Sequence, residues 1–368
     1  MRITIFICYL FCSSILMKGQ TDTLRHQKTE VNISGFLDVF YVYDFNRPKG
    51  ILRQSFFYNH NRHNEFNVNL GIIKLAVNHN RYRANIGFHA GTYVNDNYAN
   101  ESGGLKSISE ANVGMSLNKK NNLWFDLGIF SSHIGFESAV SIENLTLTRS
   151  LLAENSPYFL SGARLTFQPD KNWMFLILAC NGWQRIQRLQ GSQWISAGTQ
   201  ISFAPNDKVS VNWSTFIGTD DPDITRRMRY FNNFYSKLTI SDRLGLIIGF
   251  DIGLQQKNKG STVYNKWFSP VLMMQYTLND HIKTTFRAEY YEDDQNVIIT
   301  VPSSHGFKRS GFSINLDYSP VPDFQFRTEA RWLHSHDKIF ESNSLLTDNN
   351  IYITTSLAWK FSGYTLQN

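Results

Sequence analysis

Apolar and polar side chains alternate along residues 350–361, whose sequence is NIYITTSLAWKF. Ile351, Leu357 and Trp359 share one face of this segment, while Lys360 lies on the other. A period of two indicates a β-strand with one face in an apolar medium and the other in water. At about 3.4 Å per residue, a tilted strand of this length crosses a bilayer core, with Trp359 at interfacial depth. The segment therefore predicts a transmembrane barrel strand.

Similar segments recur back to residue 31, and they predict an all-β fold, a transmembrane antiparallel β-barrel of about sixteen strands with a water-filled lumen. Fourteen strands remain the alternative, because the alternation slips near Gly71 and within 172–184. The predicted strands are residues 31–44, 65–78, 82–93, 107–118, 122–130, 158–168, 172–184, 194–204, 208–218, 230–241, 244–256, 266–278, 282–293, 308–318, 324–334 and 350–361.

The connections alternate in length. Those after even-numbered strands, such as NKKNN at 118–122 and SPVPD at 319–323, are short and rich in turn-forming residues. We therefore expect the short connections and both termini in the periplasm, and the longer loops outside the cell.

Within the strands, charged side chains fall mostly on the phase that would face the lumen. The basic ones are Lys74, Arg83, Arg164, Lys237, Lys283, Arg287, Arg327, Arg331 and Lys360, and the acidic ones are Asp38, Glu110, Asp126, Asp251, Glu289, Asp317 and Glu329.

The remaining segments complete the predicted domain organisation. Residues 1–20 have Arg2, an apolar run and then small polar residues, which is typical of a secretory signal peptide. A polar segment, 21–30, precedes a barrel over 31–361, and 362–368 form a short extension. Cleavage of the signal would leave Cys180 alone, so we expect no disulfide and no cysteine metal site. The formal charge of +6 is spread along the chain, which argues against nucleic-acid binding.

The longest connection, residues 131–157, carries many apolar side chains and is the third external loop. Because such a loop would be exposed above the membrane, we expect it to fold into the barrel and narrow the pore. A short helix capped by Thr148 is expected within it. The alternatives are a hydrophobic lid or a contact with another barrel or a lipoprotein. The charges that solutes would then meet, opposite arginines of the far wall, are Glu137, Glu143, Arg149 and Glu154.

Six further charged residues are expected to line the pore. Two interpretations stay open for them: a transverse field that orients solutes, or salt bridges that stiffen the barrel. They are Lys283, Arg287, Glu289, Arg327, Glu329 and Arg331.

Other chemistry finds weaker support in the sequence. The histidine pairs of HNRH at 60–63 and HSH at 334–336 lack further ligands nearby, so no metal and no cofactor are predicted. Ser131, Ser132, His133 and Glu137 supply hydrolase residue types, but there is no Gly-x-Ser-x-Gly turn, and no enzyme activity is predicted. The acidic run 292–296 could hold Ca²⁺, although it is more simply the edge of a solvated loop.

Five segments resemble the β-barrel porins of Bacteroidetes, the OmpL-like group: 58–74, 84–101, 123–139, 147–167 and 181–186. The resemblance implies an outer-membrane porin. The expected function is a passive aqueous diffusion channel for small hydrophilic solutes with a weak anion preference. The alternative is a non-conducting barrel that acts as a scaffold or surface-binding protein. Expected partners are outer-membrane lipids and lipopolysaccharide, the barrel-insertion machinery and the solutes, and a homo-oligomer remains open.

Overall fold

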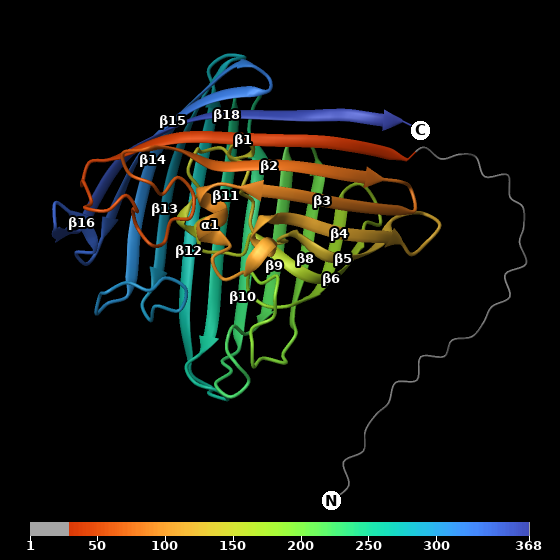
Figure 1. Ribbon diagram of the computed structural model, residues 1–368, viewed down its shortest axis with the longest axis horizontal. Coiled ribbons are helices and arrows are strands. Elements are labelled where there is room, and N and C mark those ends of the chain that lie inside the picture. The colour runs from red at the N-terminus through yellow and green to blue at the C-terminus, as the bar shows by residue number, and fades with distance from the viewer. Residues whose placement is uncertain (1–28, 368) are drawn as a thin grey trace, which may run out of the picture.

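The computed structural model describes residues 29–367, so the predicted signal peptide and most of the segment 21–30 lie outside the described residues. Sixteen antiparallel strands form a closed barrel in which each strand pairs with its sequence neighbours and β1 pairs with β18 (Figure 1). The predicted sixteen strands are confirmed. They are β1 (Glu30–Asp44), β2 (Phe66–Asn78), β3 (Tyr82–Ala90), β4 (Ile108–Ser116), β5 (Leu123–Ser131), β6 (Phe159–Phe167), β7 (Trp173–Cys180), β8 (Ser196–Asn206), β9 (Val209–Gly218), β10 (Arg229–Thr239), β11 (Leu244–Gln256), β12 (Tyr264–Thr277), β13 (Ile282–Asp293), β14 (Phe307–Val321), β15 (Phe324–Ser335) and β18 (Asn349–Gln367).

The alternation along each strand separates an apolar outside from a polar inside. On β14, Phe312 and Ile314 are 41% and 60% exposed, whereas Ser313, Asn315 and Asp317 between them are buried. A charge on the lipid-facing side would cost roughly 2–4 kcal/mol at mid-depth, which explains why the charged residues keep to the inward phase.

Several strand ends differ from the prediction, and three of them are instructive. β3 ends at Ala90 and β7 at Cys180, each shorter than expected. β18 continues beyond the predicted end at Phe361 and pairs with the start of β1 as far as Gln367. Gly363, with φ of +105°, is the extra residue of a β-bulge between these two strands. This bulge breaks the period of two, and the sequence pattern therefore stops at Phe361.

The eight external loops are numbered in chain order. They are L1 (45–65), L2 (91–107), L3 (132–158), L4 (181–195), L5 (219–228), L6 (257–263), L7 (294–306) and L8 (336–348). L2 contains α1 (Thr92–Asn97) and the 3₁₀ helix η1 (Gly103–Ser107), L3 contains η2 (Ser141–Glu143) and α2 (Leu151–Glu154), and L8 contains the hairpin of β16 (Phe340–Ser342) and β17 (Leu345–Thr347). Within residues 29–367, no helix has the length and apolar character needed to cross a membrane.

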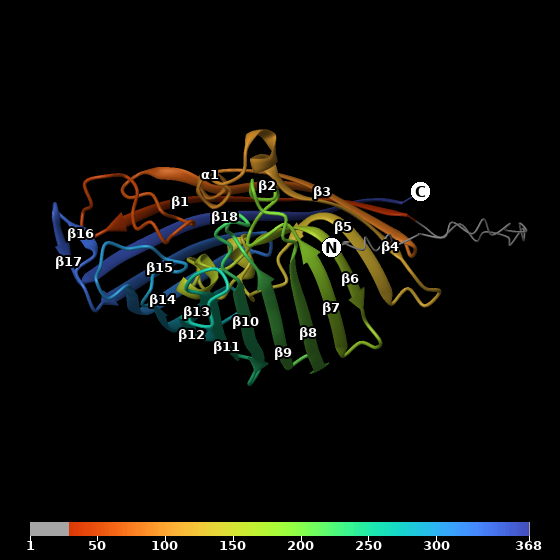
Figure 2. The same ribbon diagram turned by 90° about the horizontal axis from the view of Figure 1, so that it is seen from below.

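Several loops fold over and into the barrel, as Figure 2 shows for the segments in its interior. One hydrophobic cluster joins side chains of four loops to the inner wall: Phe57 of L1, Leu151 of L3, Ile299 of L7 and Phe340 of L8 pack in the same cluster as Trp267 of β12. The external half of the lumen is therefore packed by loop residues.

Candidate functional site

L3 enters the lumen and lies against the inward face of β13, β14 and β15, which we call the docking wall. The Thr148 amide donates to Glu329 Oε2 at 2.6 Å, and the Thr148 hydroxyl donates to the same oxygen at 2.8 Å. The Leu151 amide donates to Glu289 Oε2 at 2.7 Å. Two carboxylates of the wall thus bind the main chain of L3 directly.

Two positively charged residues of the docking wall, Arg287 and Arg331, bind the main-chain carbonyl groups of the same part of L3. Arg287 donates to the Thr148 carbonyl at 2.6 Å and to Glu329 Oε1 at 2.7 Å. Arg331 donates to the Arg149 carbonyl at 3.0 Å. Hydrogen bonds with an ionised partner are about twice as strong as neutral ones, so this set forms a firm attachment for the middle of L3.

Arg327 attaches the earlier part of the loop. Its guanidinium forms a paired contact with Asp317, with Nε to Oδ1 at 2.6 Å, and also donates to the carbonyls of Ser141 and Asn144. The 3₁₀ turn η2 is therefore held on β15, and L3 has two separate attachments along the docking wall.

Of the two interpretations for the wall residues, these contacts support salt bridges that stiffen the barrel, because Arg287 pairs with Glu329 at 2.7 Å and Arg331 with Glu289 at 2.5 Å. They do not support charges that line open water. Arg287, Arg327 and Glu329 are 0% exposed and Arg331 is 1% exposed, so they are covered by L3 instead of lining open water. A buried charge is tolerated only when it is paired and hydrogen-bonded, and L3 supplies much of that pairing. Lys283 does not join them, because it is exposed near the periplasmic end of β13.

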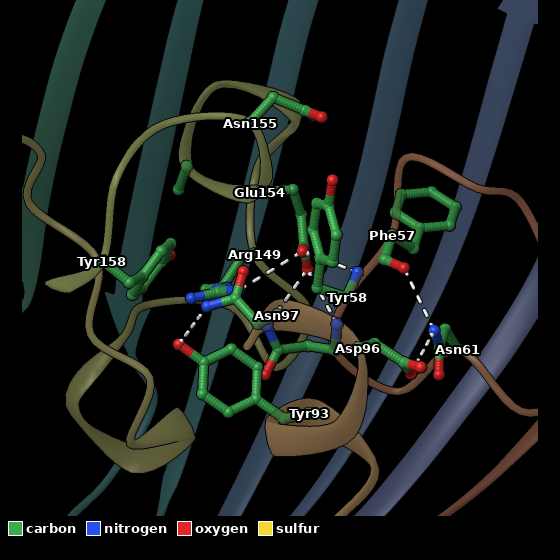
Figure 3. Close-up of polar contacts among 12 residues, drawn as sticks. Phe57, Tyr58, Asn61, Tyr93, Asp96, Asn97, Arg149, Glu154, Asn155 and Tyr158 are labelled. Atoms are coloured by element: carbon green, nitrogen blue, oxygen red, sulfur yellow. Dashed lines mark hydrogen bonds and ion pairs between the residues drawn. The ribbon is translucent and has the colours of Figure 1, made fainter. Parts of the chain in front are cut away.

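Arg149 and Glu154 of L3 face L1 and L2 (Figure 3). Arg149 Nη2 lies 3.3 Å from Glu154 Oε2, and the guanidinium stacks on the Tyr158 ring at 3.4 Å. Glu154 also accepts from the Tyr58 amide of L1 at 2.9 Å. Both charged residues were expected to meet solutes opposite far-wall arginines. That arrangement is wrong: they are 2% and 3% exposed, and the arginines of the docking wall contact L3 directly.

The helix in L3 begins later than expected. Ser150 caps α2, since its Oγ accepts from the Ala153 amide at 3.2 Å. Thr148, the predicted cap, instead uses its hydroxyl to bind Glu329. Ser150 also donates to Glu137, so this predicted pore charge is tied to its own loop.

A cavity of about 490 Å³, with both charged and apolar side chains in its lining, lies between the first half of L3 and the inner wall formed mainly by β1 to β4. Glu143 reaches it and forms an ion pair with Lys360 of β18, with side chains 42% and 38% exposed. On the nearby strands β2 and β4, Lys74 and Glu110 pair at 2.7 Å. The charged residues that line the cavity are Lys74, Glu110, Glu137, Glu143, Lys237 and Lys360.

Glu137 has an unusual environment among these. Burial raises the pKa of its carboxyl above the ordinary value, although the Arg287 guanidinium and the hydrogen bonds from Ser150 act in the opposite direction. A raised pKa means that this carboxyl takes up a proton more readily than a free glutamate as the pH falls.

The histidines of the two sequence motifs, at 60–63 and 334–336, have separate partners. His60 pairs with Asp38 at 2.9 Å inside the barrel, while His63 Nδ1 accepts from a main-chain amide. His334 contacts Asn349, apart from His336. These positions do not support joint metal ligation within either histidine motif.

The residues considered for a hydrolase site and for a calcium site are likewise bound to other protein groups. His133 Nε2 lies 2.8 Å from the carbonyl of Thr215 rather than beside a serine. In the acidic run, Asp293 accepts three main-chain amides of L7, and Asp294 pairs with Lys308 at 3.0 Å. Asp293 is therefore occupied by protein donors, and the charge of Asp294 is balanced by a lysine.

The closed barrel of sixteen strands, its apolar exterior and the loop folded into its lumen define an outer-membrane β-barrel of the porin class. Residues 30–361 match the family described as "Putative beta-barrel porin-2, OmpL-like", and the chain belongs to this family. The predicted family and outer-membrane location are confirmed, and a porin family is a class of channels rather than enzymes. No curated protein sequence matches the chain significantly.

Solved structures show the same fold at low sequence identity. An anion-selective porin from Comamonas acidovorans is similar with a TM-score of 0.60 and 8% identity, covering 90% of this chain and 100% of that one. The outer membrane channel DcaP of Acinetobacter baumannii has a TM-score of 0.59 and 12% identity, covering 90% and 97%. The trimer form of OmpT from Vibrio cholerae has a TM-score of 0.58 and 7% identity, covering 90% and 99%.

Proposed function

We propose that this protein is a passive channel for small hydrophilic solutes and that L3 forms its narrowest part. The observation that carries the proposal is the charged cavity between L3 and the inner wall. Charged residues are common on the lumen face of water-filled barrels and would be costly on a lipid face. Lys237 and Lys360 lie toward the periplasmic ends of their strands. We therefore place the cavity on the periplasmic side of L3, as the part of the solute path that leads from L3 to the periplasm.

Selectivity should be weak, with a small preference for anions. Three lysines and three glutamates line the cavity, and two ion pairs, Lys74–Glu110 and Lys360–Glu143, neutralise most of them. Lys237 lies 3.5 Å from Phe136 O and 5.7 Å from the centre of the Tyr235 ring, and it forms no ion pair among the described residues, whereas Glu137 accepts hydrogen bonds from Ser150 within its own loop. We infer that the charge left facing the path is the positive one of Lys237, and rings of side-chain charge set ion preference in such pores.

A homo-oligomer is part of this proposal, prompted by the trimer form in which OmpT of Vibrio cholerae was solved. Contacts between barrels would use the apolar exterior.

The alternative is a barrel that does not conduct and that serves as a scaffold or surface-binding protein. The packed external half of the lumen favours it, because Phe57, Leu151 and Phe340 belong to one hydrophobic cluster that spans several loops. A permanently closed lumen would leave only the external loops for function.

Recordings from purified barrels in planar bilayers separate the two. A heat-modifiable, folded preparation should give discrete ohmic steps, and a salt gradient should give a small reversal potential of the sign for anions. Silence from the same preparation would refute the channel and support the scaffold. Strong cation selectivity would refute the proposed balance of charges in the cavity.

A further inference from the structure

Two external loops bring three metal-binding side chains to one point at the outer end of the barrel. His305 belongs to L7, and His336 and Asp337 belong to L8. His305 Nδ1 lies 3.0 Å from Asp337 Oδ2, and His336 Nδ1 lies 3.1 Å from Asp337 Oδ1. The two imidazole rings are 5.3 Å apart between centroids. One potential ligand atom from each residue falls within 4.8 Å of the others.

The carboxylate at the centre of this group is held in place by neighbouring serines. Ser303 of L7 donates its hydroxyl to Asp337 Oδ2, so both loops contact this side chain. The Asp337 amide donates to Ser335 Oγ at 3.0 Å, so the main chain of Asp337 is held as well as its side chain. Ligands that are oriented by surrounding hydrogen bonds bind metals more tightly than free ones.

The spacing suits a transition-metal ion. For a tetrahedral ion with bonds of about 2.0–2.1 Å, neighbouring ligand atoms are separated by roughly 3.3 Å. The two histidine–carboxylate distances are already close to this value, and small rotations of exposed rings would bring the histidine nitrogens together. Side-chain exposures of 61% for His305 and 65% for His336 leave room for water or a further ligand.

The ligand chemistry selects the class of ion. Two imidazoles and one carboxylate suit Zn²⁺, Cu²⁺ and Ni²⁺, whereas Ca²⁺ and Mg²⁺ prefer all-oxygen sites with more ligands. We propose that His305, His336 and Asp337 form a surface site for one divalent transition-metal ion. Because the ligands come from both L7 and L8, the ion joins these two loops at the external mouth.

Joining them has a structural consequence. Ile299 of L7 and Phe340 of L8 pack in the hydrophobic cluster inside the barrel. An ion that links the two loops near these residues therefore stabilises the packed arrangement of the external half. The proposal does not depend on whether the barrel conducts, and its test needs no conductance.

Isothermal titration of the barrel with Cu²⁺ and Zn²⁺ tests the site, using protein refolded in detergent without a polyhistidine tag or lipopolysaccharide. We expect one ion per barrel, and the Cu²⁺ electron paramagnetic resonance spectrum should show coupling to two imidazole nitrogens. H305A and H336A should each weaken binding at least tenfold, and D337N should weaken it as well.

His334 provides the matched control, since it is a neighbouring histidine bonded to Asn349 and stands outside the group. H334A should bind the metal as the parent does. The proposal is overturned if H305A and H336A bind like the parent, if H334A loses affinity as strongly as they do, or if the parent binds no ion. Heat-modifiable mobility on gels verifies that every variant retains the barrel.

Discussion

Replacing Glu329 with glutamine should release L3 from the docking wall without unfolding the barrel. Glu329 is 0% exposed and accepts hydrogen bonds from the Thr148 amide, the Thr148 hydroxyl and Arg287, all within 2.6–2.8 Å. A glutamine has no negative charge and presents a donor in place of one acceptor oxygen. Arg287 and the Thr148 amide would then be left buried with a poor partner.

The size of the effect follows from this burial. Removing one partner of a buried ion pair costs about 3–5 kcal/mol, because the other charge stays buried without compensation. Since 1.36 kcal/mol is a factor of ten, the equilibrium between docked and released L3 should shift by roughly 100- to 5000-fold. The barrel itself is held by ladders between all sixteen strands, so the cost falls mainly on the attachment of the loop.

Limited trypsin digestion measures this shift through Arg149, which is 2% exposed in the docked loop. When the loop opens and closes faster than it is cut, the cleavage rate follows the population of the open form. Mass spectrometry of the fragments should therefore show cleavage after Arg149 in E329Q at least tens of times faster than in the parent.

Asp126 gives a matched control. It is also a fully buried carboxylate, bound by Arg83 at 2.5 Å and Arg164 at 3.2 Å, and its ion pairs are with β3 and β6 rather than with L3. D126N should leave the cleavage after Arg149 unchanged. The reasoning is refuted if E329Q is cut no faster than the parent, or if D126N accelerates the same cleavage equally.

Three further predictions concern the cavity and the closing strand. K237E should move the reversal potential in a salt gradient toward cations, because it inverts the cavity charge with the fewest partners. Lowering the pH from 7 to 5 should strengthen the anion preference, since the raised pKa of Glu137 means that its negative charge is lost early, and E137Q should reduce this dependence. A β-carbon at Gly35 would overlap the Phe361 ring, so G35V should lower outer-membrane levels on immunoblots. G245V, with open space around it, should leave those levels unchanged, and equal levels of the two variants would contradict this packing.

The barrel could be predicted from sequence because the two solvents impose a simple pattern. Lipid outside and water inside force a period of two on every strand, and the turn residues mark where the chain reverses. The pattern fails where the backbone departs from regular pairing. The bulge at Gly363 interrupts the alternation of apolar and polar residues, so the end of β18 cannot be recognised from the sequence. The helix α1 begins where β3 was predicted to end.

The site could be predicted only in part. The apolar content of L3 indicated that it needs a surface to pack against, and the loop does lie inside the barrel. The sequence could not show which surface, because Thr148 and Glu329 are far apart along the chain and meet only through closure of the barrel. For the same reason the burial of Arg149 by L1 and L2 was missed, as was the meeting of His305 with His336.

The most direct test of a channel narrowed by L3 is the single-channel conductance of a variant that lacks residues 139–152. This deletion removes η2, α2 up to Leu152 and the contacts with Arg287, Arg327 and Arg331, while leaving every strand of the barrel in place. Conductance should rise several-fold over the parent in the same salt. A folded, inserted variant that conducts like the parent would contradict the account, because L3 would then not line the pore.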